Sequence, residues 1–334
     1  MDPLTHTITG WLVARAGLER AAPYATPTLL VAANIPAVDI VQALGGGTFY
    51  LAHYRTWSHS LIGAAVLGAA VGLAFWKLAT RLRQGSGGQG VAPSRLMALG
   101  IVGAMTHLLL DWMTAGGAQL LWPFHGARYA LDWFPQMDLW LFVALVLGVA
   151  LPGLFRLITE EIGARSTRGG MLAGAWLALA ALMVLAAGRG VLHSEAAAKL
   201  EARLYKGRTP LRLGAFPTPL NPFGWIGVVE TEGTHELVNV TLLGRGDETE
   251  ETLYKPAGSP AADRALDTDE AHAFLGWARF PAATMTPRVD HGWGVELRDL
   301  RGGGDSPVTL RIELDPAGEV EAAQFSIRFL LLLC

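Results

Sequence analysis

The sequence predicts an α-helical polytopic membrane bundle of about four to six helices, followed by a soluble, antiparallel β-rich domain of the α+β class. Hydrophobic residues make up 51% of the 334 residues and charged residues only 16%, against roughly 25% charged residues in ordinary soluble domains. The long apolar runs are confined to residues 1–192, whereas residues 193–334 have the charge density of a soluble protein. We therefore expect two regions that face different solvents.

Four apolar stretches approach or exceed the ~20 residues that cross a bilayer. They are His59 to Leu78, Ser94 to Trp112, Asp138 to Phe155 and Gly170 to Leu192. Two further stretches, Pro3 to Ala16 and Pro27 to Leu44, are shorter or more polar. We interpret these two as a helical hairpin packed inside the bundle. At ~1.5 Å per residue the first of them is about 20 Å long, so a re-entrant helix is an alternative to a span.

The distribution of Lys and Arg predicts the orientation, because positive residues collect in short cytoplasmic loops. Three connections are basic and hold Arg15 and Arg20; Lys77, Arg81, Arg83 and Arg95; and Arg156, Arg165 and Arg168. The loop from Met113 to Met137 has only Arg128. With six helices, both chain ends then lie outside the cytoplasm. The outer face receives His6, His53, His59, Asp111, His125, Asp132 and Asp138, and His107 lies one turn below.

After the last span we expect a helical and proline-rich linker at residues 193–225 and a soluble β-rich domain at residues 226–334. Ala215 to Trp225 contains three prolines and is unsuited to a helix or a central strand. Alternating β-type runs follow at Ile226 to Glu230, Glu236 to Leu243, Gly292 to Leu300, Val308 to Leu314 and Ala322 to Phe329. One helix, at Asp267 to Ala278, interrupts them. These runs predict one small antiparallel sheet with one helix.

Composition excludes several kinds of site and partner. A formal net charge of -3 offers no basic footprint for nucleic acid. The single cysteine, Cys334, allows no intramolecular disulfide and no cysteine-based zinc site. A metal would therefore be held by His, Asp or Glu. The first residues lack the pattern of a secretory signal, so we expect insertion to use the internal apolar segments.

Ionisable residues within the apolar helices are the first candidates for such a site. His107 and Asp111 stand four positions apart, so one helix face presents both side chains to one metal. Ionisable groups inside a membrane are costly and usually have a partner or a function. Asp39 lies in an apolar helix after Asn34 and Pro36. It is either a third ligand or part of a packing hydrogen bond between spans.

A second group lies near the outer face. His53 and His59 flank a polar connection with Arg55, in which Ser58 is placed to cap the next helix. This connection is either an interfacial loop or part of a metal site in which Arg55 grips a phosphate oxygen. His6 is a further possible ligand. Asp132 and Asp138 border the outer loop as candidate bases, although Asp138 could instead cap a helix.

These segments resemble the YdjM-like family of LexA-regulated inner-membrane proteins, which are described as metal-dependent hydrolases. The resemblance rests on four segments: Asp2 to Gly10 with His6, Ala33 to Asp39, the box His53 to Ser60, and the helix His107 to Asp111. The later stretch Pro217 to Trp225 also resembles the family. Ala37 replaces the first acidic residue of the family's Pro-Asp-x-Asp motif. Tyr54, Trp57 and Ser58 depart from its His-Arg-Gly-x-Thr-His-Ser box. The ligand order is also similar to that of zinc-dependent phospholipase C, which implies phosphoester chemistry by analogy.

The sequence thus predicts a membrane-bound metal-dependent hydrolase in the cell's inner membrane, with its site and C-terminal domain on the extracytoplasmic side. Imidazole and carboxylate ligands favour zinc. The expected ligands are His6, Asp39, His53, His59, His107 and Asp111, with Asp132, Asp138 and Arg55 as catalytic residues. A site at the headgroup level favours a lipid or lipid-linked phosphate as substrate. The alternatives are an ion or proton transporter and a metal-stabilised scaffold without catalysis.

Overall fold

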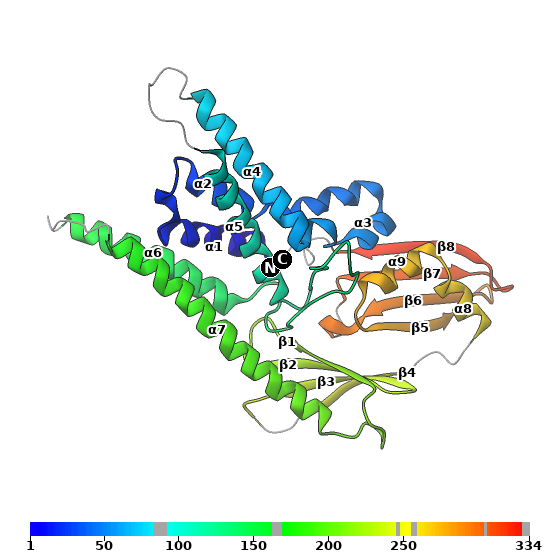
Figure 1. Ribbon diagram of the computed structural model, residues 1–334. Coiled ribbons are helices and arrows are strands. Elements are labelled where there is room, and N and C mark those ends of the chain that lie inside the picture. The colour runs from blue at the N-terminus through cyan, green and yellow to red at the C-terminus, as the bar shows by residue number, and fades with distance from the viewer. Residues whose placement is uncertain (83–91, 162–168, 245–247, 255–258, 304–305, 329–334) are drawn as a thin grey trace. The chain divides into compact units, whose positions relative to one another are not determined.

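The computed structural model describes residues 1–82, 92–161, 169–244, 248–254, 259–303 and 306–328 (Figure 1). The chain divides into two compact units. The first comprises residues 1–39 and 55–189, and the second comprises residues 40–54 and 190–333. Of the basic residues used to predict the orientation, Arg83, Arg165 and Arg168 lie outside the described residues.

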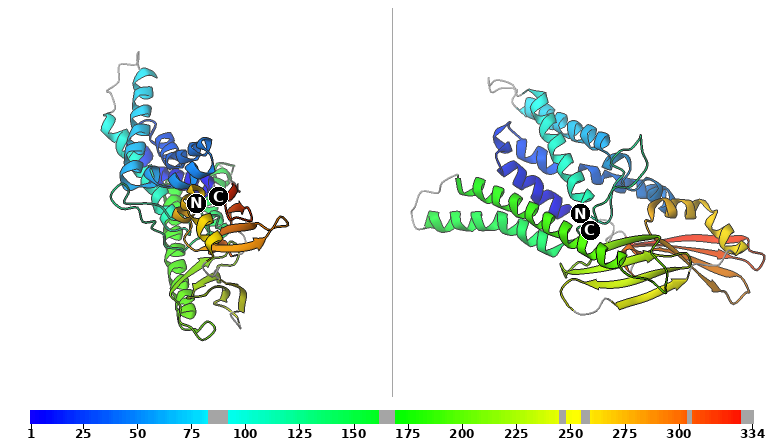
Figure 2. Two further views of the ribbon diagram at one scale, coloured as in Figure 1. Left: turned by 90° about the vertical axis from the view of Figure 1, so that its right-hand side faces the viewer. Right: turned by 60° about the horizontal axis from the view of Figure 1, so that its bottom comes forward.

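The first unit is helical, as the composition predicts. Its segments are α1 (Pro3–Arg15), the 3-10 helix η1 (Leu18–Arg20), α2 (Ala25–Ala32), the start of η2 (Ile35–Gly45), η3 (Trp57–His59), α4 (Leu61–Leu82), α5 (Pro93–Trp112), α6 (Leu139–Glu161) and most of α7 (Gly169–Glu201). Figure 2 shows the helices from two further sides. The combination of a membrane-type helical bundle with a β-rich domain is confirmed.

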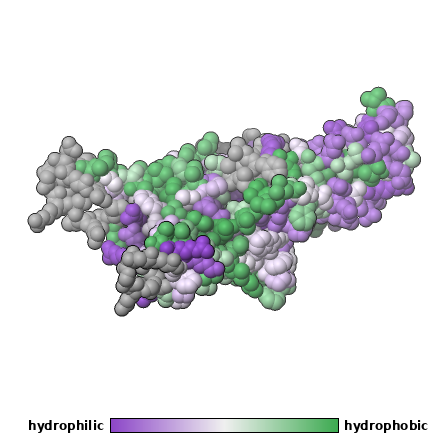
Figure 3. Space-filling model, turned by 90° about the horizontal axis from the view of Figure 1, so that it is seen from above, coloured by the Kyte–Doolittle hydropathy of each residue, from purple (hydrophilic) through white to green (hydrophobic). Residues whose placement is uncertain are grey.

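Four helical segments in the described residues are long and apolar enough to cross a membrane. They are Ala25–Gly45, Leu61–Leu82, Pro93–Trp112 and Leu172–Glu201, whereas Leu139–Phe155 is a shorter apolar helix. The expected spans that begin near residues 59, 94 and 170 are therefore present, whereas the expected span from Asp138 to Phe155 is found only as a shorter apolar helix. Ala25–Gly45, where a shorter or more polar helix of a hairpin was expected, also qualifies as a span. Large apolar side chains such as Val66, Leu147 and Val184 are exposed. Hydrophobic residues, drawn in green, cover much of the face shown in Figure 3, as lipid contact requires.

The predicted hairpin of the first two helices is present. Asp2 caps α1 by accepting a hydrogen bond from the Thr5 backbone N–H at 2.9 Å. Gly10 lets α1 approach α2 closely, because a Cβ at this position would lie 2.9 Å from the Ala33 Cβ. The α2 helix ends at Ala32 and the chain continues as the 3-10 helix η2 from Ile35. Pro36 explains this change, since proline disrupts a continuing α-helix.

Glycines also bring α4 and α5 together. A Cβ on Gly68 would lie 2.4 Å from the Gly100 carbonyl oxygen, and a Cβ on Gly72 would lie 2.2 Å from the Leu96 carbonyl oxygen. Gly68 and Gly72 are four positions apart on one helix face, the small-residue spacing that lets membrane helices approach closely. The start of α4 is thereby held beside the end of α5, where the sequence places its candidate ligands.

The second unit contains two four-stranded antiparallel sheets with the orders β1-β2-β3-β4 and β5-β6-β7-β8. The strands are β1 (Arg212–Pro217), β2 (Gly224–Glu230), β3 (Thr234–Thr241), β4 (Glu248–Tyr254), β5 (Pro281–Pro287), β6 (Trp293–Asp299), β7 (Val308–Leu314) and β8 (Val320–Ile327). Its helices are α3 (Gly47–His53), α8 (Pro260–Leu266), α9 (Asp269–Trp277) and the end of α7. Leu200 of α7 packs with Trp225 and Val238 of the first sheet, and Phe274 of α9 packs with Leu310 of the second.

The prediction of one sheet with one helix was wrong. Strands β1, β4 and β5 and helix α8 were not predicted. All three of these strands lie at a sheet edge, where prolines and charged residues are tolerated. Pro217 ends β1, Pro281 begins β5, and β4 is rich in glutamate. The proline-rich segment expected to be a linker therefore supplies an edge strand and the turn that follows it.

Candidate metal centre

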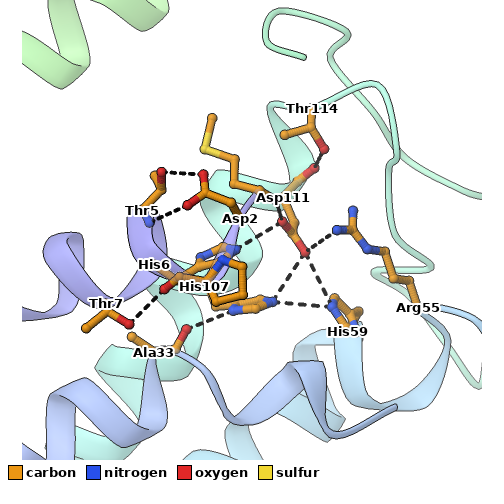
Figure 4. A network of polar contacts seen from close by, with 12 residues as sticks. Asp2, Thr5, His6, Thr7, Ala33, Arg55, His59, His107, Asp111 and Thr114 are labelled. Atoms are coloured by element: carbon orange, nitrogen blue, oxygen red, sulfur yellow. Dashed lines mark hydrogen bonds and ion pairs between the residues drawn. The ribbon is translucent and has the colours of Figure 1, made fainter. Parts of the chain in front are cut away.

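Three histidines and one aspartate of the first unit converge at a buried point (Figure 4). The Nε2 atoms of His6, His59 and His107 each lie 3.3 Å from a carboxylate oxygen of Asp111. His59 Nε2 also lies 3.3 Å from His107 Nε2. All four side chains are at most 3% exposed. The Met1 amino group contacts the same carboxylate.

Separate helical segments position these side chains. His6 lies on α1, His59 ends η3 just before α4, and His107 and Asp111 share one face of α5. The Ala33 carbonyl oxygen lies 2.8 Å from His107 Nδ1, which directs the opposite ring nitrogen toward Asp111. The His6 and His107 rings stack with their centroids 3.8 Å apart. The hairpin and the close contact of α4 with α5 thus assemble the cluster.

The residues present fit a divalent metal. Three buried atoms of the cluster have no hydrogen-bond partner among the described residues. They are both ring nitrogens of His6 and Oδ2 of Asp111. Such groups are costly to bury without a partner. His6, His107 and Asp111 offer ligand atoms that all lie within 4.8 Å of one another. Imidazole nitrogen and carboxylate oxygen are ligands that zinc takes in proteins.

Asp39 faces the other side of His59. Its Oδ2 lies 3.5 Å from His59 Nδ1 and accepts a hydrogen bond from the Arg55 backbone N–H at 3.0 Å. Ser58 Oγ lies 3.0 Å from the same ring nitrogen. Metal-binding histidines commonly have a carboxylate or another polar group at the nitrogen that does not bind the metal. The sequence predicts Asp39 as a ligand, and the structure places it behind His59.

Arg55 lies at the edge of the cluster in an unusual backbone conformation. Its Nη2 is 3.4 Å from Asp111 Oδ2, and its φ is +49°. A residue other than glycine is strained in this region, and such strain is common at functional sites. Asp39 accepts from the Arg55 N–H, and the Arg55 carbonyl accepts from the Gln119 N–H at 3.1 Å. Both hydrogen bonds hold the strained residue in place.

His53 is positioned differently from the other predicted ligands. It belongs to the second unit, is exposed on α3, and its Nδ1 lies 2.9 Å from the Phe49 carbonyl oxygen. The histidine of the box whose Nε2 lies close to the Asp111 carboxylate is His59 and not His53. Of the two histidines in the box, only His59 is brought to the cluster within the first unit.

The two candidate bases have different surroundings. The Asp138 carboxylate caps α6 by accepting from the Leu141 N–H at 2.8 Å, and it pairs with Arg189 Nη2 at 2.5 Å. Asp132 is buried with a φ of +58°. Its chain neighbours donate backbone hydrogen bonds to the Trp112 and Met113 carbonyls. Asp132 therefore lies in the loop segment that is fixed to the end of α5, directly after Asp111.

Burial changes the acidity of the two histidines outside the spans. It lowers the pKa of His6 well below the ordinary value. Burial also lowers the pKa of His59, although the neighbouring Asp39 carboxylate acts in the opposite direction. Both rings are thus neutral near pH 7, the form in which imidazole binds a metal.

Two polar contacts near the site differ from the sequence-based expectation. Ser58, expected to cap the helix after the box, faces His59, and Ser60 instead accepts a hydrogen bond from the Gly63 N–H at 2.9 Å. The partner of Asp138 was not predicted at all. The sequence feature that could have indicated this ion pair is Arg189, a lone cation within an otherwise apolar run from residue 172 to residue 192.

Comparison with known proteins gives one family match. The family described as YdjM inner membrane protein matches residues 1–193, which is more than half of the chain. The match includes every residue of the cluster and neither β-sheet. No curated protein and no solved structure matches the chain.

Proposed function

Because the chain belongs to the YdjM inner membrane protein family, we propose that its buried cluster is the metal centre of a membrane-bound hydrolase. The observation that supports this most strongly is the convergence of three imidazole Nε2 atoms on the Asp111 carboxylate. The proposed ligands are His6, His59, His107 and Asp111. Three imidazoles with one carboxylate favour zinc, and activation of a water would use a fifth coordination position beside these four ligands.

A divalent ion in this position would lower the pKa of a water from about 15.7 toward 7 and polarise the bond under attack. The chain itself would position the ligands and move protons. Asp39 and the Ala33 carbonyl would hold the rings of His59 and His107 through their Nδ1 atoms. We assign the role of general base to Asp132, because it is buried in the loop segment whose backbone is hydrogen-bonded to Trp112 and Met113, directly after Asp111.

Arg55 would bind the substrate. The residue is 5% exposed and its Nη2 lies 3.4 Å from Asp111 Oδ2, so it would supply a fixed positive charge at the edge of the proposed metal centre. Arginine binds phosphate and carboxylate oxygens through several donors in a planar arrangement. A phosphoester, or another ester with an anionic group, fits this combination of arginine and metal ligands.

The position of the cluster along the helices supports an amphiphilic substrate. Asp111 is next to Trp112, the last residue of α5, and His59 precedes the start of α4 at Leu61. Both helices are candidate spans, so the site would lie at the level of the lipid headgroups. A phospholipid or a lipid-linked phosphate would reach this level directly from the bilayer. The basic loops favour the extracytoplasmic face for the site and for the C-terminal domain.

The test is metal analysis combined with an activity assay on the full chain in detergent. We expect about one equivalent of zinc or another divalent ion per chain, and release of phosphate or headgroup from short-chain phospholipids or lipid-linked pyrophosphates. Chelation should abolish release, and added zinc should restore it. Stoichiometric metal without turnover of any phosphoester, ester or amide would contradict the hydrolase and favour a metal-stabilised scaffold.

A further inference from the structure

The first sheet of the second unit exposes two leucines at one of its ends. This apolar loop end consists of residues 218–223, between β1 and β2, and residues 241–243, after β3. Leu220 is 72% exposed and Leu243 is 65% exposed. The sequence has no charged residue from Leu213 to Val229 or from Leu237 to Leu243. Lys199 Nζ of α7 donates a hydrogen bond to the Thr241 carbonyl at 2.9 Å, and Arg245 and Asp247 follow Leu243 in the sequence. Exposed leucines with a lysine beside them suit the boundary between lipid and water.

The opposite end of the same sheet is charged. The β2–β3 turn carries Glu232, which is 78% exposed and lies 3.7 Å from Arg208. Arg212 pairs with Glu230 at the same end, and Lys206 Nζ lies 3.8 Å from Glu236 Oε1. The two ends of one small sheet therefore suit different environments, water at the end with Glu232 and the boundary between lipid and water at the end with the two leucines.

The course of α7 indicates where this boundary lies. Residues Leu172–Glu201 of this helix form a candidate span, and the residues from Gly190 onward belong to the second unit. The His193 ring is 5.5 Å from the ring of Trp225, the second residue of β2 and a neighbour of the 218–223 turn. Two turns later, Leu200 packs on Gly227, further along β2. The apolar loop end is thus the end of the sheet from which α7 leads back to its span.

We propose that the apolar loop end rests in the interface of the bilayer that α7 spans. Leu220 and Leu243 would enter the boundary between headgroups and acyl chains. Thr218, Asn221 and Asn239 line a shallow open hollow beside Leu220, and their neutral hydrogen-bonding groups suit the headgroup layer. The β4 strand begins at this end with Glu248, and a carboxylate is costly to place in an apolar phase. We therefore assign the contact with the bilayer to the two turns and not to the β4 edge. Val191 lies near the end of the apolar stretch from Gly170 to Leu192 and is 60% exposed, as contact with lipid near the interface requires.

The experiment uses the full chain reconstituted into phosphatidylcholine and phosphatidylglycerol vesicles. A Cys334→Ser background removes the native thiol, and Leu220→Cys or Leu243→Cys carries an environment-sensitive fluorophore. Glu232→Cys, at the charged end, is the matched control. Lipids with a quencher high on the acyl chain report bilayer contact, and aqueous iodide reports exposure to water.

We expect the Leu220 and Leu243 labels to be quenched by the lipid quencher at least about twofold more than the Glu232 label, with the reverse order for iodide. Quenching of the Leu220 and Leu243 labels by iodide alone would overturn the proposal. Protection of both labels from both quenchers would also overturn it, because a protein surface would then cover this end. Two label positions keep the result interpretable if one variant folds poorly.

Discussion

His59 Nε2 lies 3.3 Å from His107 Nε2, although 48 positions separate the two residues. His107 Nδ1 faces the Ala33 carbonyl and His59 Nδ1 faces Asp39, so both Nε2 atoms are left to face Asp111. This arrangement is the one that the proposed metal centre would need. This arrangement leads to the first prediction.

Replacing His59 with alanine should remove most of the bound metal, because the coordination sphere loses one imidazole. The control is His53→Ala, which changes the other histidine of the same box, whose Nδ1 faces the Phe49 carbonyl on α3. That variant should keep its metal. The metal content of both purified proteins shows which of the two histidines binds the metal. Equal loss in both variants would show that His53 is a ligand as well.

Asp39→Asn should weaken metal binding without abolishing it. The carboxylate faces His59 Nδ1 and the Arg55 backbone, so its loss would leave the ring less firmly oriented. Replacing a group in this position typically costs about 10- to 100-fold in metal affinity or activity. A competition titration with a chelator measures this change. Complete loss of metal, equal to that of Asp111→Asn, would instead make Asp39 a direct ligand.

Asp132→Asn should leave metal content unchanged and lower turnover by roughly 10²- to 10⁴-fold, the usual contribution of a positioned proton acceptor. The measurement is metal content and kcat on the same preparation. Full activity in this variant would assign the base to another group.

Asp138→Asn should reduce stability and not chemistry. Asparagine keeps the helix cap but leaves Arg189 buried without its counter-charge. Breaking one partner of a buried ion pair costs about 3–5 kcal/mol. The double variant Asp138→Asn, Arg189→Met should recover much of this loss, as measured by thermal unfolding in detergent. No recovery would mean that the pair does not act as a unit.

Gly68→Val should separate α4 from α5 and thereby lower metal binding from a distance. The added side chain would meet the Gly100 backbone, and overpacking typically costs about 1–3 kcal/mol. Gly188→Val is the matched control, because no atom lies within 4 Å of a Cβ built there. Metal content should fall only in the Gly68 variant. Retention in both would show that the site tolerates a wider helix contact.

Much of this architecture could be predicted because membrane helices leave a strong signal in the sequence. The spacing of His107 and Asp111 placed both on one helix face, and the two residues contact each other as that spacing implies. Length and hydropathy likewise identified α4, α5 and α7. These predictions depend on short-range periodicity, which one sequence contains in full.

What could not be predicted depends on contacts between distant segments. Asp39 and His59 are both polar residues near an apolar segment, and only the fold shows which side of the imidazole the carboxylate faces. The same holds for Asp138, whose partner Arg189 is 51 positions away. The edge strands were missed for a different reason. Edge positions need less apolar alternation, so β1, β4 and β5 carry too weak a pattern.

The proposed ligands come from positions 6, 59, 107 and 111, so the complete site cannot form until α5 has been synthesised and inserted. An ion acquired then would tie together three segments that are synthesised at different times. Until these segments have packed, Asp111 would be a carboxylate in an apolar helix without His6 and His59 beside it, which disfavours the incomplete bundle. The supply of metal would then influence how much correctly assembled protein accumulates in the membrane, separately from any effect on turnover.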